Sequence, residues 1–492
     1  MTDHSLTSQL GALSYDPAPE SAAIARLAPS YGVFLDGKFT PADAHDQFAS
    51  INPATEETLA TVALASASDV DRAVASARRA YEKVWSKTSG AERAKYLFRI
   101  ARLIQERSRE LAVVETLDNG KPIRESRDVD VPLAAAHFFY YAGWADKLAH
   151  AGFGPDPRPL GVAGQIIPWN FPLLMAAWKL APALAAGNTV VLKPATLTPL
   201  TAMRLAELAL EAGIPENVFQ VLPGAGSSVG YRFVTHPSVR KVCFTGSNDA
   251  GRKIMAGCAD QVKRVTLELG GKSANIVFAD ADVAKAAAMA PYAVFDNAGQ
   301  DCCARSRILV QDSVYDTFME HFETAVKGVK VMDPASDASE MGPLITAAQR
   351  ESVLGYVDDA EVAFRGTAPE GKGFWMAPTV LATTDTSGRA FTEEIFGPVV
   401  SVARFRDEAE AIALANDSQF GLSGSIWTRD SGRALRVARG VETGALSVNS
   451  NSSVRYNTPF GGFKMSGIGR ELGPDALLGF SEEKNVFIST EE

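Results

Sequence analysis

Apolar stretches long enough for one buried strand alternate with helix-length stretches between about residues 160 and 270. An apolar strand, a helix and a second strand in succession are typical of a βαβ unit, whose two strands run parallel. This alternation predicts an α/β fold with a parallel sheet. The predicted strands lie within 159–172, 188–194, 219–224 and 241–247, and the predicted helices cover 171–187, 198–213 and residues from about 249.

A second alternating region begins near residue 272 and continues to about residue 445. A chain of 492 residues is too long for one ordinary hydrophobic core, so two or three domains are expected. Two helices are predicted over residues 67–118, the first with Ser68 as its N-cap. The last residues, 482–490, alternate apolar and polar side chains like a strand. A lone terminal strand needs a partner, such as another subunit.

The formal net charge is −10, and this acidic balance disfavours nucleic acid and anionic lipid as partners. No apolar run approaches the roughly 18 residues that a membrane span needs. The first twenty residues lack the basic and apolar regions of a signal peptide and are expected to form a polar, loosely held arm. The four cysteines fit a reducing compartment, so we expect a cytoplasmic protein.

Two of the cysteines, Cys302 and Cys303, are adjacent in the sequence NAGQDCCAR. Adjacent cysteines cannot easily bind one metal ion without backbone strain, and no histidine or second cysteine pair lies nearby in the sequence, so no metal is expected. A redox pair would have C-x-x-C spacing, which is absent. A nucleophile with a neighbouring cysteine and inert packing both remain open.

Other motifs have both a functional and an ordinary interpretation. In FTGSNDAGR a strand ends in a Gly-Ser turn before a helix, which either binds a diphosphate or is an ordinary turn. Lys193 ends a strand at the edge where open parallel sheets hold ligands, and it is either a ribose contact or a surface residue. Glu268 ends another strand and is either a base or a turn residue. The glycine-rich loops 393–400 and 457–472 are ordinary loops when taken singly.

Five motifs, taken together and in this order, resemble the aldehyde dehydrogenase superfamily: IIPWNFP, LELGGKS, NAGQDC, EEIFGPV and PFGGFKMSGIGRELG. The resemblance runs from about residue 51 to the C-terminus, roughly nine-tenths of the chain. It implies an α/β fold with two parallel-sheet domains and a small β arm for oligomerisation. The implied dinucleotide-binding domain spans 1–143 and 161–269, the catalytic domain 270–478, and the arm 144–160 and 479–492.

The resemblance implies NAD(P)-dependent oxidation of an aldehyde to the carboxylic acid. Cys302 matches the family's nucleophile, whose thiolate attacks the aldehyde carbon to give a thiohemiacetal and, after hydride transfer, a thioester. Asn170 matches the amide that stabilises the oxyanion together with the Cys302 backbone N–H. Glu268 matches the base that activates water. Lys179 and Glu471 match residues that relay the proton from this base.

The expected cofactor is NAD, with NADP as the alternative. Many NAD-dependent members have an acidic residue three places after the lysine of the cofactor site, where this chain has Thr196. A threonine does not repel a 2′-phosphate, so we expect weak discrimination against NADP. The residues implied to contact the cofactor are Ile167, Trp169, Lys193, Thr196, Gly226, Gly246, Ser247, Glu394, Phe396 and Phe460.

Two carboxylates, Asp296 and Asp301, occupy positions that line the substrate tunnel in the family. With apolar walls, they suit an aldehyde with a cationic end, such as an ω-aminoaldehyde or a trimethylammonio aldehyde. Arg455 at the mouth suits an anionic semialdehyde instead, and a broad aliphatic or aromatic aldehyde is the third interpretation. The implied substrate residues are Leu133, Phe171, Trp178, Asp296, Asp301, Val454 and Arg455.

Two other classes of protein remain as alternatives. A CoA-acylating dehydrogenase would pass the thioester to CoA, and the water-activating Glu268 argues against it. A non-catalytic structural protein would not need Cys302, Asn170 and Glu268 together. In the family, the C-terminal tail and the segment after GWADK bridge subunits, so a homodimer or homotetramer is expected, with no nucleic acid or membrane partner.

Overall fold

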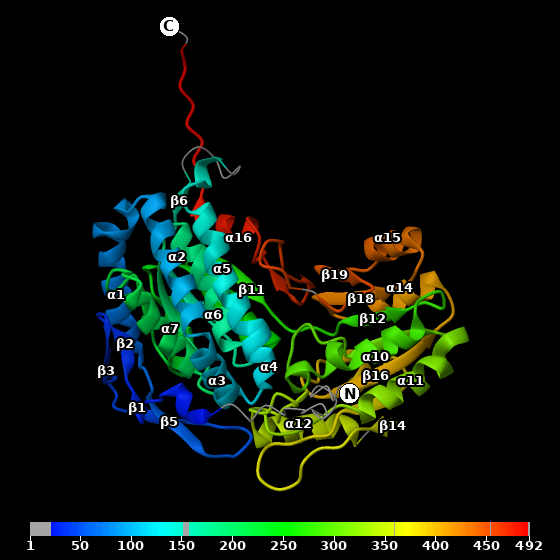
Figure 1. The fold of residues 1–492 in the computed structure, drawn as a ribbon. Helices are drawn as coiled ribbons and strands as arrows, with labels where there is room; N and C mark the ends of the chain where they lie inside the picture. The colour runs from blue at the N-terminus through cyan, green and yellow to red at the C-terminus, as the bar shows by residue number, and fades with distance from the viewer. Residues whose placement is uncertain (1–20, 151–156, 359, 453, 491–492) are drawn as a thin grey trace, which may run out of the picture.

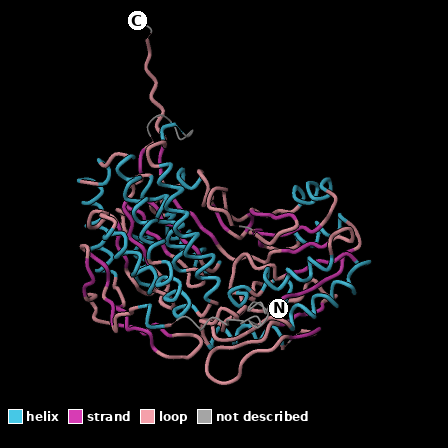
Figure 2. Tube along the Cα trace, viewed as in Figure 1, coloured by secondary structure: helices cyan, strands magenta, loops and turns pink. Residues whose placement is uncertain are grey.

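The computed structural model describes residues 21–150, 157–358, 360–452 and 454–490. The chain forms two lobes, each with its own sheet, and helices surround the strands in both (Figures 1 and 2). Among the described residues, no helix combines the length and the apolar character that a membrane crossing requires.

The first lobe contains an eight-stranded sheet in the order β21-β11-β10-β7-β8-β9-β2-β3. Its five central strands are parallel, which confirms the parallel sheet predicted from the alternation. Every residue of β7 and β8 is buried, as expected for strands covered on both faces. The central strands are β7 (Val162–Ile166), β8 (Thr189–Lys193), β9 (Phe219–Val221), β10 (Val239–Thr245) and β11 (Arg264–Glu268), and the outer strands are β2 (Val33–Leu35), β3 (Lys38–Thr40) and β21 (Gly467–Ile468).

The helices of this lobe differ from the prediction over residues 67–118. A break at Arg107 divides the second predicted helix into two. The first helix is capped by Ser66 rather than Ser68, because the Asp69 carboxylate accepts from the Ser66 backbone N–H at 2.8 Å while the Ser66 hydroxyl accepts from the Asp69 N–H at 3.4 Å. The helices are α1 (Ala67–Lys83), α2 (Gly90–Glu106), α3 (Ser108–Asn119), α4 (Ile123–Glu125), α5 (Val131–Trp144), α6 (Pro172–Ala185), α7 (Leu200–Glu211), α8 (Tyr231–Thr235), α9 (Asn248–Ala259) and α16 (Asp475–Leu478).

The second lobe contains a seven-stranded sheet in the order β14-β15-β16-β13-β12-β18-β19. All neighbouring pairs are parallel except β14 with β15, which confirms the second alternating region. Its strands are β12 (Ala274–Val277), β13 (Arg307–Gln311), β14 (Val362–Arg365), β15 (Thr379–Ala382), β16 (Val399–Phe405), β18 (Ser423–Trp427) and β19 (Ala445–Val448). Its helices are α10 (Val283–Val294), α11 (Tyr315–Lys327), α12 (Ala347–Val357), α13 (Arg389–Thr392), α14 (Glu408–Asn416) and α15 (Ser431–Gly440).

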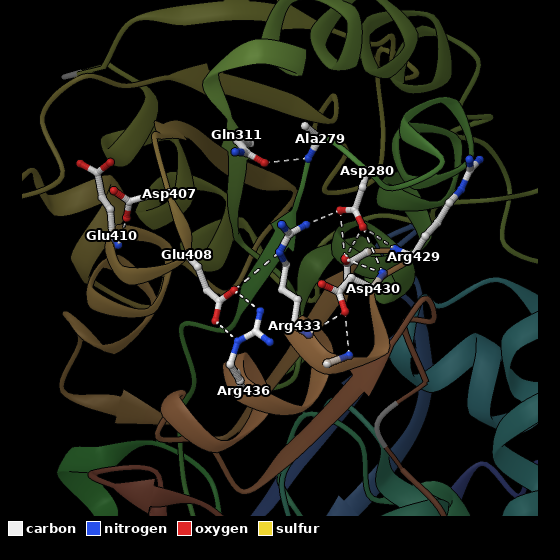
Figure 3. A network of polar contacts seen from close by, with 12 residues as sticks. Ala279, Asp280, Gln311, Asp407, Glu408, Glu410, Arg429, Asp430, Arg433 and Arg436 are labelled. Atoms are coloured by element: carbon white, nitrogen blue, oxygen red, sulfur yellow. Dashed lines mark hydrogen bonds and ion pairs between the residues drawn. The ribbon is translucent and has the colours of Figure 1, made fainter.

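A polar network lies at the carboxyl ends of β12 and β18 (Figure 3). Asp280 accepts hydrogen bonds from the Thr428 hydroxyl at 2.8 Å and from the backbone N–H groups of Arg429 and Asp430 at 3.0 and 3.1 Å. Arg433 of α15 donates to the same carboxylate at 2.6 Å. Carboxyl ends of parallel strands often bind ligands, but here the Asp280 network joins α15 to the sheet. The loop that precedes β13 lies at the opposite end of the sheet, beside the amino ends of its parallel strands.

Three small sheets complete the fold. One contains β1 (Ser30–Tyr31), β5 (Thr58–Ala63) and β4 (Gln47–Ile51), and another contains β17 (Phe420–Gly421) and β20 (Phe463–Lys464). The third joins β22 (Ser481–Glu482) to β6 (Arg158–Pro159).

Beyond β22 the chain extends away from the body (Figure 1), and Phe487 is 85% exposed. Of the strand predicted over 482–490, only Glu482 is paired in the single chain, with Arg158 of β6, and pairing of the other residues with another subunit stays a prediction. The predicted arm at residues 1–20 and part of the 144–160 segment lie outside the described residues. The domain boundaries at 143, 161, 269 and 478 stay a prediction.

Candidate active site

A cavity of ≈ 250 Å³ is lined by residues of both lobes, and we call it the Cys302 cavity. Six of the seven predicted substrate residues line it, together with Cys302 and Glu268. The exception is Arg455, which is exposed and lies outside the lining. The lining residues are Glu125, Val129, Asp130, Leu133, Phe171, Leu174, Met175, Trp178, Thr245, Glu268, Asp296, Asp301, Cys302, Cys303, Arg305, Asn451, Ser452, Val454 and Phe460.

A tight turn between α10 and β13 brings Cys302 to this cavity. Its three consecutive residues Asn297, Ala298 and Gly299 have left-handed backbone, with φ of 49°, 55° and 71°. A Cβ on Gly299 would lie 2.1 Å from the carbonyl oxygen of Gly397, so only glycine fits there. Strained backbone of this kind is costly and is typical of functional sites.

The surroundings of Cys302 disfavour its thiolate form. Contact with the Cys303 side chain raises the pKa of Cys302 well above its usual value, and burial and the Asp301 carboxylate raise it further. The Asn170 side-chain amide donates to the carbonyl oxygen of Gln300 at 3.0 Å. This bond places Asn170 against the segment that carries Cys302, and its role in an oxyanion site stays a prediction.

Glu268 ends β11 and is only 4% exposed, and no described residue bonds either of its carboxylate oxygens. Burial raises the pKa of Glu268 well above its ordinary value, and the Glu471 carboxylate raises it further. Glu471 itself pairs with Lys179 at 2.6 Å. A buried, unpartnered carboxyl group on a cavity wall can hold a water molecule and take up its proton.

A second cavity of ≈ 530 Å³, the β10–α9 groove, lies beside the start of α9. Ser247 caps that helix by accepting a hydrogen bond from the Ala250 N–H at 3.4 Å. A Cβ on Gly226 would meet no atom within 4 Å, so the backbone there faces open space. Open backbone beside a helix N-terminus fits a diphosphate. The lining residues are Ile166, Gly226, Ser227, Gly230, Tyr231, Val234, Phe244, Ser247, Asp249, Ala250, Lys253 and Ile254.

The sequence predicted two lining residues of this groove, Gly226 and Ser247, but missed Tyr231 and Lys253. Gly246 lies in the turn just before Ser247, and its missing Cβ would come within 2.6 Å of the Phe244 ring. Neither missed residue belongs to a motif, so only the fold identifies them.

The residues predicted to hold the adenosine half lie on neighbouring strand ends. Lys193 ends β8, and its carbonyl accepts from the Ile167 N–H at 3.1 Å, just after β7. The Lys193 ammonium group donates to the carbonyl oxygen of Pro194 at 3.0 Å, and burial lowers its pKa to about 8. Thr196 is half-buried three residues later.

Glu394 lies against the glycine pair that follows β11. The Gly271 N–H donates to its carboxylate at 2.8 Å, and burial raises the pKa of Glu394 to about 7. Phe396 packs edge-on against Trp169, with ring centroids 5.2 Å apart. Phe460, which was expected with Phe396 beside the nicotinamide ring, lines the Cys302 cavity.

Two acidic residues of the Cys302 cavity, Glu125 and Asp130, were missed by the sequence analysis. Asp130 forms a buried ion pair with Lys121 at 2.6 Å. Glu125 accepts from the Asn297 N–H at 3.1 Å, and it forms no ion pair within 4.0 Å among the described residues. Burial raises the pKa of Glu125 to about 7. No motif surrounds either residue, so only the fold reveals them.

Residues 39–486 match the model of the Aldehyde dehydrogenase family. The chain belongs to this family. It is an NAD(P)-dependent aldehyde dehydrogenase, which oxidises an aldehyde to the carboxylic acid, and the predicted family and fold are confirmed.

Relatives of this aldehyde dehydrogenase match it over nearly their whole length. The mitochondrial aldehyde dehydrogenase of Leishmania tarentolae is 44% identical over 475 residues, which cover 93% of this chain and 95% of that one. Betaine aldehyde dehydrogenase from Staphylococcus aureus, solved with NAD⁺, is 39% identical with a TM-score of 0.90 over 94% of this chain and 95% of that one. An NAD⁺ complex of aldehyde dehydrogenase from Bacillus cereus is 40% identical with a TM-score of 0.90, covering 94% and 97%.

Proposed function

We propose that this enzyme oxidises an aldehyde whose far end carries a positive charge, with NAD as cofactor. The observation that carries this proposal is that Glu125, Asp130, Asp296 and Asp301 all line the cavity that holds Cys302. An apolar cavity with so many carboxyl groups favours a cationic ligand over a neutral or anionic one.

The four carboxyl groups differ in their cationic neighbours. The charges of Lys121 and Arg124 act on Glu125, and Arg124 acts on Asp296, but neither carboxylate forms an ion pair within 4.0 Å among the described residues. Asp130 is paired with Lys121, and Asp301 lies near the buried Arg305. Burial raises the pKa of Asp296 well above its ordinary value, and the Glu125 carboxylate raises it further. The repulsion between the Glu125 and Asp296 carboxylates is relieved either when one of them takes up a proton or when a cation binds between them. Glu125 and Asp296 are therefore the proposed receptor for the charged end.

The proposed catalytic roles are those that the family resemblance implies, and the shared cavity of Cys302 and Glu268 supports them. The Cys302 thiolate attacks the aldehyde carbon, and the Asn170 amide with the Cys302 backbone N–H stabilises the oxyanion. When bound, NAD supplies the hydride acceptor. Glu268 then removes a proton from the water that attacks the thioester, and Lys179 and Glu471 form the adjoining proton relay.

The β10–α9 groove and its flanking residues support the placement of NAD. Ser247 and Gly226 would hold the diphosphate, Lys193 the adenosine ribose, and Glu394 the second ribose. Weak discrimination against NADP follows from Thr196, which carries no negative charge to repel a 2′-phosphate. We expect Thr196→Glu to raise KM for NADP far more than KM for NAD, by about ten- to hundredfold, or roughly 1–3 kcal/mol. Equal effects on the KM values for both cofactors would show that Thr196 does not lie beside the ribose 2′ position.

The test of the substrate class compares aldehydes of equal length with cationic, neutral or anionic ends. We expect the cationic aldehyde to have the highest kcat/KM. Asp296→Asn should lower kcat/KM for it by about five- to thirtyfold, with little change for the neutral aldehyde. Asp301→Asn is the matched comparison, because the Asp301 carboxylate already accepts from the Cys303 N–H at 2.9 Å. Equal rates for the three aldehydes would contradict the proposal.

A broad aliphatic or aromatic aldehyde is the second candidate, which the apolar walls at Leu133, Phe171 and Trp178 favour. An anionic semialdehyde has less support, because Arg455 lies outside the lining of the cavity. A reducing compartment such as the cytoplasm suits the four cysteines, all of which are free.

A further inference from the structure

Three consecutive residues, Asp301, Cys302 and Cys303, each place one potential ligand atom within 4.8 Å of the other two. A turn in which the Ala304 N–H donates to the Asp301 carbonyl at 3.0 Å folds this segment. Sequence spacing alone argued against a shared ion, because adjacent cysteines cannot easily bind one ion without backbone strain. Around a tetrahedral Zn²⁺ the ligand atoms lie roughly 3.5–4 Å apart, so small side-chain rotations close the set.

We propose that Asp301, Cys302 and Cys303 form a binding site for a thiophilic divalent cation such as Zn²⁺, and that this ion inhibits the enzyme reversibly. Two sulfur ligands select soft or borderline cations over Mg²⁺ and Ca²⁺. Three protein ligands leave the fourth tetrahedral position open to the cavity, where water completes the shell. Each thiol releases its proton when its sulfur binds the ion, so binding of one Zn²⁺ releases two protons.

The surroundings already orient these ligands. One oxygen of Asp301 accepts from the Cys303 N–H at 2.9 Å, which fixes the carboxylate and leaves its other oxygen for an ion. Arg305 is buried and donates to the Cys303 carbonyl at 2.5 Å, which holds the turn in place. Two thiolates, one carboxylate and Zn²⁺ sum to one negative charge, and the nearby guanidinium group compensates it.

The inhibition follows because Cys302 Sγ is both the proposed metal ligand and the proposed nucleophile. When Cys302 Sγ binds the ion, its lone pair is not free to attack an aldehyde. The ion also occupies the cavity where the aldehyde carbon must lie. We therefore expect inhibition by Zn²⁺ that competes with the aldehyde and is fully reversed by a chelator.

The experiment measures inhibition and ligation separately in the full-length enzyme. Zn²⁺ inhibition constants are determined for the wild type, Cys303→Ser and Asp301→Asn, each scored against its own metal-free rate. Cys258→Ser is the matched control, because Cys258 is a buried thiol outside the Cys302 cavity. Co²⁺ replaces Zn²⁺ in a parallel titration, in which thiolate-to-cobalt absorption reports the number of sulfur ligands.

Loss of an outer-shell partner alone weakens metal sites 10- to 100-fold, so loss of a ligand should weaken Zn²⁺ inhibition at least about tenfold. We expect that loss in Cys303→Ser and Asp301→Asn but not in Cys258→Ser. The Co²⁺–thiolate absorption should fall by about half in Cys303→Ser and in Cys302→Ser. Unchanged inhibition and absorption in Cys303→Ser would overturn the proposal, because Cys302 alone would then hold the ion.

A measurement on the wild type covers the case in which a variant does not fold. Alkylation of Cys302 and Cys303 by iodoacetamide is followed by mass spectrometry with and without Zn²⁺. Protection of both thiols supports the site, and protection of Cys302 alone contradicts it.

Discussion

At the scale of single residues, the proposed nucleophile and the proposed base are in similar surroundings. Cys302 and Glu268 are both surrounded by protein, and the pKa values of both are raised. A raised pKa makes the ionised form of each group a stronger proton acceptor, but it also lowers the ionised fraction of both groups at a given pH. The rate of attack should therefore rise with pH.

The first prediction separates the two adjacent cysteines. Cys302→Ala should reduce aldehyde oxidation to background, because it removes the proposed nucleophile. Cys303→Ala should keep most of the activity, since Cys303 is 5% exposed and only contributes to the lining of the Cys302 cavity. Steady-state rates with one aldehyde and NAD measure both, and the reverse pattern would exchange the two assignments.

The second prediction concerns Glu268. Glu268→Gln should still release one equivalent of reduced cofactor per site in a burst and then stall, because the amide cannot accept the proton of the attacking water. Turnover should fall by about 10²–10⁴-fold, the usual contribution of a general base. Stopped-flow absorbance measures the burst, and mass spectrometry must find the acyl group on Cys302. A folded variant without any burst would show that Glu268 acts before deacylation.

At the scale of secondary-structure elements, the Asp280 network shows how α15 is held on the second sheet. Burial alone would raise the pKa of Asp280, but hydrogen bonds from Thr428 and Arg429 and the charge of Arg433 outweigh it and lower the pKa. A depressed pKa means that the ionised group contributes stability above its unfolded-state pKa, and this contribution is lost as pH falls through the folded-state value.

The third prediction follows from this sign. Asp280→Asn should lower the free energy of unfolding by about 1–3 kcal/mol at neutral pH, because charge-assisted hydrogen bonds become weaker neutral ones. The difference from the wild type should shrink as pH falls below about 4. Urea unfolding at several pH values measures it. A difference that does not change between pH 7 and pH 3 would assign the loss to shape rather than to charge.

Elements were easier to predict than their ends and their tertiary contacts. Buried strands such as β7 and β8 were recognisable because every residue faces a covered surface, which makes the apolar run continuous. The start of α1 was misplaced because Ser66 and Ser68 are equally good caps, and only the reciprocal bond from Asp69 decides between them.

The residues of the candidate site were likewise only partly predictable from the sequence. Cys302, Glu268 and Asn170 belong to recognisable motifs, whereas Glu125 belongs to none and meets the nucleophile turn 172 residues later in the chain. Such a contact depends on packing between lobes, which no local pattern reports.

At the scale of the whole molecule, the exposed tail after β22 argues for assembly. Val486, Phe487 and Ile488 are 69%, 85% and 77% exposed, which is costly for three consecutive apolar side chains. We propose that a second copy of the chain covers them in a homodimer or a homotetramer.

The fourth prediction tests this assembly. A chain cut after residue 480 removes β22 and the tail, so it should lose its oligomeric state and expose the edge of β6 to other partners. Light scattering coupled to size-exclusion chromatography measures the mass of the truncated and full-length chains. A soluble, active monomer from the truncated chain, or a full-length monomer, would contradict the prediction.

The pairing of β21 with β11 has a consequence for biosynthesis. Glu268 lies opposite Gly467, so β11 gains its outer neighbour only from a segment about 200 residues later. At roughly 5–20 residues per second, the ribosome needs on the order of 10–40 s to supply that segment. During this interval the nascent first lobe presents an open sheet edge, which is the kind of surface that chaperones protect. Synthesis that stops shortly before residue 467 should therefore yield an insoluble product rather than a folded cofactor-binding half.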